Sequence, residues 1–140
     1  MKKILIIDDD DRSSLYHSQL ITDSLGNKNV SVYTNEKYDF RYSEEYDLII
    51  TDLHLGSANI NVLDSLERLY SYKIKNKQKI PKIILHSGSN HSYIYDFSKL
   101  LKNKAPFDIS YTSKSSHKKD LLHKVKRMLE INDLDNRLDS

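Results

Sequence analysis

The chain contains no cysteine. A disulfide framework and thiolate chemistry are therefore excluded, and the composition fits a reducing compartment, so we expect a cytoplasmic protein. Long hydrophobic runs are also missing. The apolar run near the N-terminus, Ile4 to Ile7, leads directly into acidic residues, and it is too short for a signal peptide or a membrane span.

An excess of charge of one sign is missing as well. Lys and Arg number 22 against 20 Asp and Glu, which gives a formal net charge of +2. No global field then recruits nucleic acid or a membrane, so a partner must be recognised locally. A basic face near the C-terminus is the one feature that suggests DNA binding, but a solvated helix explains it better. Its residues are Lys118, Lys119, Lys124, Lys126 and Arg127.

What is present is an alternation of strand-length apolar runs with stretches of helical period. This pattern is typical of an α/β fold, a doubly wound parallel sheet with helices on both faces. We predict strands at 2–7, 30–33, 47–51, 81–85 and 107–112, and helices at 11–25, 36–43, 62–73, 94–101 and 121–129. The first helix should bury Leu15, Ile21 and Leu25, and the fourth should bury Ile94, Phe97, Leu100 and Leu101. The length of 140 residues suits one domain, which we assign to 1–131, with a polar tail at 132–140.

Polar residues follow four of the five predicted strands. Asp8 and Asp9 follow the first, Asp52 the third, Ser87 the fourth and Lys114 the fifth. In a parallel sheet these positions meet at one edge, where ligands of open α/β sheets bind.

Three carboxylates at one edge need a compensating charge. Two like charges about 4 Å apart repel by roughly 4 kcal/mol at an effective dielectric constant of 20, so the cluster of Asp8, Asp9 and Asp52 must either hold a proton or bind a cation. A divalent metal ion is the simpler resolution. Side-chain oxygens favour Mg²⁺ or Mn²⁺ over zinc. His54 has no second histidine or cysteine at ligand spacing, and we expect it to contribute its backbone carbonyl.

A carboxylate beside a hard cation, a lysine and a hydroxyl is suited to receiving a phosphoryl group. We predict that Asp52 is the nucleophile, that Lys114 supplies positive charge and that Ser87 donates a hydrogen bond to the phosphoryl group.

These residues resemble the receiver domain of two-component response regulators, in a stand-alone form similar to the chemotaxis regulator, over residues 2–129. The motifs are Ile6-Ile7-Asp8-Asp9-Asp10, Ile49-Ile50-Thr51-Asp52-Leu53-His54-Leu55, Leu85-His86-Ser87-Gly88 and Tyr111-Thr112-Ser113-Lys114. The resemblance implies a flavodoxin-like three-layer α/β/α fold with strand order 2-1-3-4-5.

The same resemblance implies roles for the site residues. Asp52 would be the phosphoacceptor of a phosphorelay, a signalling switch with no turnover activity. Asp9, Asp52 and the His54 carbonyl would hold Mg²⁺, with Asp8 acting through water. Tyr111 would be the aromatic switch residue that moves with Ser87.

The resemblance also implies partners. A sensor histidine kinase or a histidine phosphotransfer protein would supply the phosphoryl group. A downstream protein would bind the face formed by the predicted elements 94–101, 107–112 and 121–129, and the same face could support a homodimer.

Two alternatives stay open. Ser115 follows Lys114 where the family usually has proline, and a non-proline cis bond costs about 2.5–4 kcal/mol, so we predict a trans bond or a rearranged loop. This change supports a pseudo-receiver that acts as a phosphate-independent protein-interaction module. The run Asp8-Asp9-Asp10 also fits a haloacid-dehalogenase-like phosphatase, but that family needs a late acidic pair after a strand, which this sequence lacks.

Overall fold

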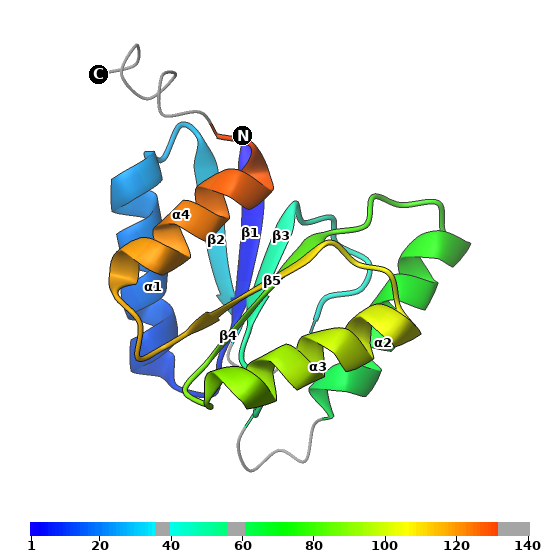
Figure 1. Cartoon of the computed structure of the whole chain (residues 1–140). Coiled ribbons are helices and arrows are strands. Elements are labelled where there is room, and N and C mark those ends of the chain that lie inside the picture. The colour runs from blue at the N-terminus through cyan, green and yellow to red at the C-terminus, as the bar shows by residue number, and fades with distance from the viewer. Residues whose placement is uncertain (36–39, 56–60, 132–140) are drawn as a thin grey trace.

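A computed structural model of the chain describes residues 1–35, 40–55 and 61–131. The predicted tail, 132–140, lies outside the described residues and stays a prediction. Nine elements follow one another (Figure 1): β1 (Lys2–Ile7), α1 (Asp11–Leu25), β2 (Val30–Asn35), β3 (Leu48–Thr51), α2 (Val62–Lys75), β4 (Lys82–Ser87), α3 (His91–Lys104), β5 (Ile109–Ser113) and α4 (Lys118–Leu129).

The five strands form one parallel sheet in the order β2-β1-β3-β4-β5, as predicted. Figure 1 shows α1 and α4 on one face of this sheet and α2 and α3 on the other, which makes the three-layer α/β/α fold. Because all strands run the same way, their carboxyl ends lie at one edge.

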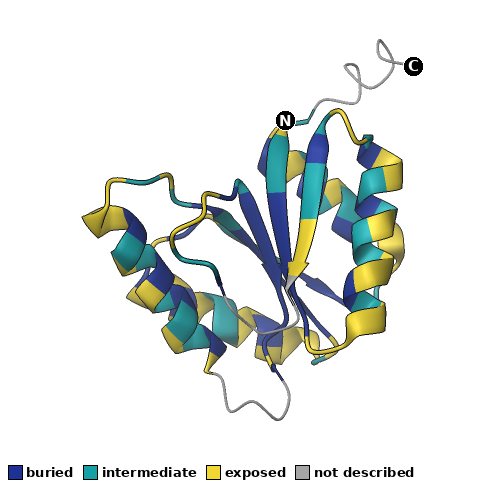
Figure 2. Ribbon diagram, turned by 180° about the vertical axis from the view of Figure 1, so that it is seen from behind, coloured by how far each residue is buried: buried dark blue, intermediate teal, exposed yellow. Residues whose placement is uncertain are grey.

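The alternation of side chains along each strand builds two separate cores, since successive residues point to opposite faces. Ile4 and Ile6 pack with α1 and α4, whereas Leu5 and Ile7 pack with α2 and α3. β3 and β4 divide in the same way. Figure 2 shows the central strands buried between helices whose outer sides are exposed. Burial on both faces explains why these strands are continuous apolar runs.

Short polar side chains fix where the helices begin and end. Asp10 caps α1 by accepting hydrogen bonds from the backbone N–H groups of Arg12 and Ser13. Asn61 and Asn90 cap α2 and α3 in the same manner. Gly26 ends α1, as predicted, with a positive φ of 86° that costs glycine little.

Two leucines predicted to be buried are exposed instead. Leu15 is 68 % exposed and Leu100 is 52 % exposed. In α1 the buried stripe runs through Ser14, Ile21 and Leu25, so Leu15 lies about 100° away from it around the helix. In α3 Leu101 occupies the inward position, and an adjacent leucine cannot share it. The prediction assigned burial by hydrophobicity alone, and it was wrong for both residues.

The predicted short helix 36–43 is absent from the part of it that is described, residues 40–43, and 36–39 lie outside the described residues. The described residues therefore contain four helices, and the predicted fourth and fifth helices are α3 and α4. Phe40 and Tyr46, which lie in the segment before β3, are buried in the core on the α2 and α3 side.

Lys73 shows how this segment is held. Although lysine carries a charge, Lys73 is only 1 % exposed. Its ammonium donates to the Glu44 carbonyl at 2.7 Å and to Gln78 Oε1 at 2.9 Å. Burial lowers the pKa of Lys73. The side chain therefore joins α2 to the segment before β3.

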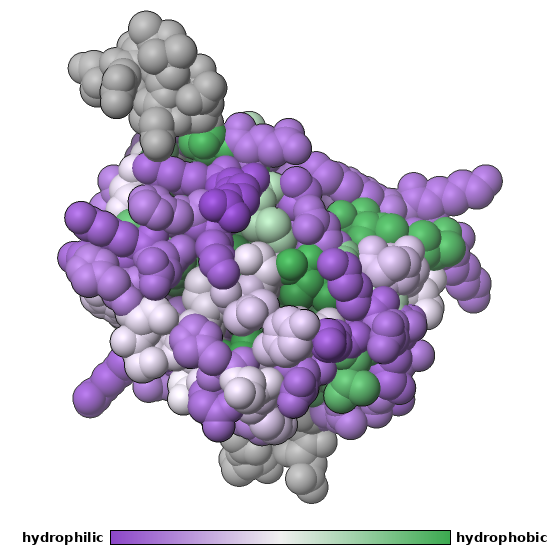
Figure 3. Space-filling model, in the orientation of Figure 1, coloured by the Kyte–Doolittle hydropathy of each residue, from purple (hydrophilic) through white to green (hydrophobic). Residues whose placement is uncertain are grey.

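The face of the molecule in Figure 3 is mostly hydrophilic, with hydrophobic areas scattered over it. Across 1–35, 40–55 and 61–131, no helix combines the length and the hydrophobicity needed to cross a bilayer.

The different burial of two α1 residues gives a stability test. Ile21→Ala should lower the free energy of unfolding by about 2–5 kcal/mol, because Ile21 is fully buried. Leu15→Ala should change it by less than about 0.5 kcal/mol. Urea denaturation of the two variants and the unchanged protein measures both. Equal losses would contradict the α1 orientation.

Candidate functional site

The strand register brings the two acidic segments together. Ile7 of β1 pairs with Thr51 of β3, so Asp8 and Asp52 each lie one residue beyond a paired position. The Asp52 N–H also donates to the Ile7 carbonyl at 3.1 Å, which extends the pairing to the site. Both carboxylates are largely buried, with Asp8 4 % and Asp52 8 % exposed.

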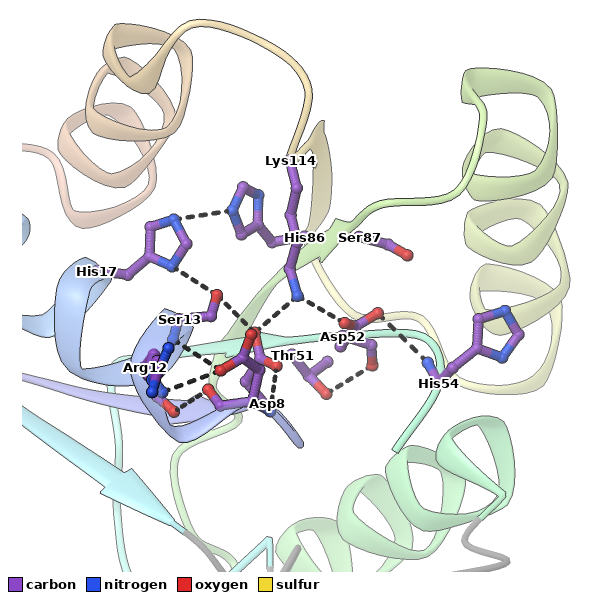
Figure 4. A network of polar contacts seen from close by, with 12 residues as sticks. Asp8, Arg12, Ser13, His17, Thr51, Asp52, His54, His86, Ser87 and Lys114 are labelled. Carbon is purple, nitrogen blue, oxygen red and sulfur yellow. Dashed lines mark hydrogen bonds and ion pairs between the residues drawn. The ribbon is translucent and has the colours of Figure 1, made fainter. Parts of the chain in front are cut away.

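Hydrogen bonds from neighbouring residues hold each buried carboxylate in place (Figure 4). Asp8 Oδ1 accepts from the Asp10 N–H at 2.9 Å, and Asp8 Oδ2 accepts from the Ser13 hydroxyl at 3.2 Å. Asp52 Oδ1 accepts from the Leu53 N–H at 2.7 Å and from the His54 N–H at 3.4 Å. The two side chains are therefore fixed before any ligand binds.

Lys114 joins the two carboxylates. Its ammonium lies 2.8 Å from Asp8 Oδ2 and 2.8 Å from Asp52 Oδ2. Lys114 is placed there by β5. The pairing of β4 with β5 ends at Ser113, and the next N–H, that of Lys114, still donates to the Ser87 carbonyl at 2.8 Å. Burial alone would lower the pKa of Lys114, but hydrogen bonds to Asp52 and Asp8 outweigh burial and raise it. Lys114 therefore stays charged.

Asp9 completes the acidic cluster. Carboxylate oxygens of Asp8, Asp9 and Asp52 lie within 4.8 Å of one another, and Asp9 is the exposed member. Desolvation and repulsion from Asp8 and Asp52 raise the pKa of Asp9.

The cluster fits a divalent hard cation. Three carboxylates and one ammonium carry two net negative charges, and all side-chain donors are oxygens, the ligands that Mg²⁺ and Ca²⁺ prefer. Asp8, Asp9 and Asp52 would hold such an ion on the exposed side of the cluster, where Asp9 lies.

His54 takes no part through its ring. Figure 4 shows the imidazole directed away from the carboxylates, and the ring lies 5.4 Å from that of Tyr93. Its N–H contacts Asp52, so the backbone of His54 lies beside the cluster. The role of its carbonyl as a metal ligand stays a prediction.

Ser87 is the last residue of β4, and Tyr111 lies on β5. Ser87 is 1 % exposed, and its hydroxyl donates to Ser89 Oγ and accepts from the Ser89 N–H, both at 3.2 Å. The half-buried Tyr111 ring lies 6.3 Å from Tyr95 and 5.1 Å below the Lys124 ammonium. Their switching roles stay predictions.

The loop after β5 keeps an ordinary backbone. Every peptide bond between described residues is trans, so the predicted trans bond between Lys114 and Ser115 is confirmed. The Ser113 hydroxyl accepts from the Ser115 N–H at 3.2 Å. Lys114 thus reaches both carboxylates without the proline.

Sequence reasoning missed four residues that extend the polar network away from the cluster. Ser13, His17 and His86 form a chain of contacts that starts at Asp8 (Figure 4). His86 also contacts Thr112. Each of the four lies within a helix or a strand, and no sequence spacing links 17 to 86.

Comparison with known proteins gives structural matches alone. No sequence-family model and no curated protein matches the chain. A response regulator, TrrA of Thermotoga maritima, solved with Mg²⁺ and BeF, is 28 % identical with a TM-score of 0.60, over 91 % of this chain and 99 % of that one. A CheY-like receiver domain protein of Methanospirillum hungatei is 24 % identical with a TM-score of 0.65, over 93 % and 94 %.

A third match carries a modified residue. A response regulator of Burkholderia pseudomallei, solved with a phosphorylated aspartic acid, a calcium ion and citrate, is 18 % identical with a TM-score of 0.63, over 99 % of this chain and 72 % of that one. The chain therefore has the receiver-domain fold that the sequence resemblance implied.

The raised pKa of Asp9 predicts that its charge destabilises the metal-free fold. Asp9→Asn should raise the free energy of unfolding at pH 7 by up to about 1 kcal/mol, because it removes repulsion from Asp8 and Asp52 at an exposed position. The gain should shrink as the pH falls through the raised pKa and vanish below the ordinary value of 3.8, where Asp9 is protonated in both states.

Urea denaturation in EDTA at several pH values measures this effect. Asp11→Asn is the matched control, since Asp11 lies in the first turn of α1 and should gain nothing from neutralisation. A loss of stability in Asp9→Asn at pH 7 would contradict the electrostatic interpretation.

Proposed function

We propose that this chain, which has the receiver-domain fold, is a phosphoacceptor switch of a two-component phosphorelay, with Asp52 as the residue that is phosphorylated. The contact of the Lys114 ammonium with both Asp52 and Asp8 at 2.8 Å carries the proposal. This contact places a fixed positive charge beside Asp52, which ends a strand and also belongs to a cluster of carboxylates that could hold a cation.

The chemistry needs one displacement at phosphorus. An Asp52 oxygen attacks the phosphorus of a phosphoimidazole or an acyl phosphate, a bond from that oxygen to phosphorus forms, and the bond to the leaving nitrogen or oxygen breaks. The leaving group keeps the bonding electrons. Asp52 becomes an acyl phosphate and needs no general base, because a carboxylate is already deprotonated at neutral pH.

The residues around Asp52 have different roles in the proposed reaction. The Leu53 N–H fixes one Asp52 oxygen. Lys114 contacts the other oxygen and can follow the negative charge to the phosphoryl group. Asp8, Asp9, Asp52 and the His54 carbonyl would hold Mg²⁺, with Mn²⁺ as a substitute. A bound divalent cation supplies positive charge to the phosphoryl oxygens. The Mg²⁺ and BeF in the Thermotoga protein and the phosphorylated aspartic acid in the Burkholderia protein support this assignment.

Ser87 is proposed to respond to phosphorylation. In the present structure its hydroxyl is engaged with Ser89. A new phosphoryl group on Asp52 offers a stronger, charged acceptor, so the hydroxyl should move toward it. Tyr111 lies on β5, two residues before Ser113, which pairs with Ser87. Its ring is then the element that carries the change to the surface.

The output face is proposed to comprise α3, β5 and α4. A cavity of about 410 Å³ opens there, lined by His91, Tyr111, Asp120, Lys124 and Arg127. Lys124 donates to the Tyr111 carbonyl and lies over its ring, so this α4 cation serves local packing, which favours a protein partner over nucleic acid. The phosphoryl donor would be a histidine kinase or a phosphotransfer protein in the cytoplasm, and a homodimer could form through the same face.

Asp52 phosphorylation can be tested by intact mass. Incubation with acetyl phosphate and Mg²⁺ should add the mass of one phosphoryl group to the unchanged protein. Asp52→Asn should lose the adduct, because an amide oxygen is a poor nucleophile. Omission of Mg²⁺ should reduce the yield at least tenfold.

Asp108→Asn is the control, since its exposed carboxylate precedes β5 at the opposite end of the strands. An adduct that persists in Asp52→Asn would refute the assignment of the nucleophile. A protein that binds no Mg²⁺ and gains no phosphoryl group from acetyl phosphate or from a histidine kinase would instead be a phosphate-independent interaction module.

The switch is tested with Ser87→Ala. Addition of Mg²⁺ and beryllium fluoride to the unchanged protein should shift the amide resonances of Tyr111 and Lys124. In Ser87→Ala the shifts near Asp52 should persist while those of Tyr111 and Lys124 fall by at least half. Ser98→Ala on α3 is the control and should respond like the unchanged protein. An undiminished response of Tyr111 in Ser87→Ala would exclude Ser87 as the coupling residue.

A further inference from the structure

Two histidines that the phosphoryl chemistry does not use meet beside Lys114. His17 belongs to α1 and His86 to β4, and their Nε2 atoms lie 3.3 Å apart. The rings are nearly perpendicular, with an interplanar angle of 89° and centroids 4.8 Å apart. His86 is 6 % exposed. The pair lies on the α1 and α4 side of Lys114 in Figure 4.

Both outer ring nitrogens are anchored by hydroxyl groups. His17 Nδ1 lies 3.3 Å from Ser13 Oγ, and the Ser13 hydroxyl donates to Asp8. His86 Nδ1 lies in hydrogen-bond contact with Thr112 Oγ1. Because Ser13 has a single hydroxyl proton and gives it to Asp8, His17 Nδ1 must carry a proton and donate it to Ser13 Oγ. A neutral His17 then presents the lone pair of its Nε2 to His86.

His86 can adopt the same arrangement. At present its Nε2–H donates to His17, so its Nδ1 accepts from Thr112. In the other neutral tautomer Nδ1–H donates to Thr112 Oγ1, because a hydroxyl can accept as well as donate. Both histidines would then have an unprotonated Nε2, the two 3.3 Å apart, and each ring would be held by an outer N–H bond to a hydroxyl oxygen. Metal-binding histidines have this arrangement of outer hydrogen bonds.

The distance between the two nitrogens fits one shared metal ion. Zinc lies about 2.0–2.1 Å from imidazole nitrogens, so two tetrahedral nitrogen ligands are about 3.3–3.4 Å apart. We propose that His17 and His86 bind one transition-metal ion of the zinc class through their Nε2 atoms, at a site separate from the oxygen-lined acidic cluster. Imidazole favours such ions over Mg²⁺.

The surroundings allow the ion to enter and to complete its shell. A cavity of about 330 Å³ adjoins the pair, lined by His17, His86, Lys114, His117 and Lys118 among others. Water in this cavity would supply the remaining ligands. The nearby Lys114 charge is balanced by Asp8 and Asp52 at 2.8 Å each.

Both rings are also in the protonation state that a metal needs. Burial, followed by the charges of His17 and Lys114, lowers the pKa of His86 to about 4. Burial also lowers the pKa of His17. At neutral pH neither ring has to lose a net proton to bind, since only the position of the His86 proton changes.

The test is titration with Zn²⁺ and Co²⁺ in excess Mg²⁺, which occupies the acidic cluster. We expect one Zn²⁺ per chain by calorimetry, the visible absorption of tetrahedral Co²⁺, and a rise in melting temperature with Zn²⁺. His17→Gln should weaken Zn²⁺ binding at least tenfold and abolish the Co²⁺ absorption. The half-buried position of His17 lets this variant fold, which its melting curve in EDTA verifies.

His123→Gln on the exposed side of α4 is the matched control and should bind Zn²⁺ like the unchanged protein. His86→Gln provides a second variant that should also lose the Co²⁺ absorption. Absence of Zn²⁺ binding in the unchanged protein, or equal binding in His17→Gln, would overturn the proposal. Phosphoryl uptake at Asp52 is measured separately in Mg²⁺ alone, so failure of one proposal leaves the other intact.

Discussion

The Lys114 ammonium between two buried carboxylates is the interaction on which the rest of the site depends. Asp8 and Asp52 end neighbouring strands, and the register of β1 and β3 forces them side by side. At about 4 Å their repulsion amounts to roughly 4 kcal/mol even at an effective dielectric constant of 20. The Lys114 ammonium lies 2.8 Å from each carboxylate and offsets this repulsion. Its two ion pairs join β5 to the ends of β1 and β3.

The same interaction ties the site to the layers of the fold. Lys114 reaches the carboxylates because β5 pairs with β4 up to Ser113, and the next N–H still bonds to the Ser87 carbonyl. A change at Asp52 therefore alters the charge that Lys114 balances, and it does so at the end of the strand that carries Tyr111. The proposed cation site, the proposed phosphoacceptor and the proposed output face all share this strand end.

Strands and their order were the part of the fold that the sequence predicted best. β1 was predicted at its observed bounds, because strands buried on both faces are continuous apolar runs. Helix orientation was predicted less well. Leu15 and Leu100 were assigned to the core although their neighbours Ser14 and Leu101 occupy the inward positions. Hydrophobicity does not reveal which side of a helix meets the sheet when polar residues interrupt the stripe.

The candidate site divides in a similar way. The acidic cluster and Lys114 were predicted because strand ends of a parallel sheet converge, a rule that depends on topology alone. The pair of His17 and His86 was not predictable. It joins a helix and a strand 69 positions apart, and it depends on the rotation of α1 about its axis, the property that the apolar pattern left undetermined.

The buried amine of Lys73 offers a way to measure how often α2 separates from the segment before β3. Lys73 is 1 % exposed and its amine donates to two fixed oxygens, so an amine-directed reagent cannot approach it in the native state. Modification of Lys73 then requires that α2 separate from the segment before β3. The labelling rate of this single amine, relative to that of the exposed lysines, would report the frequency of that separation without any introduced probe.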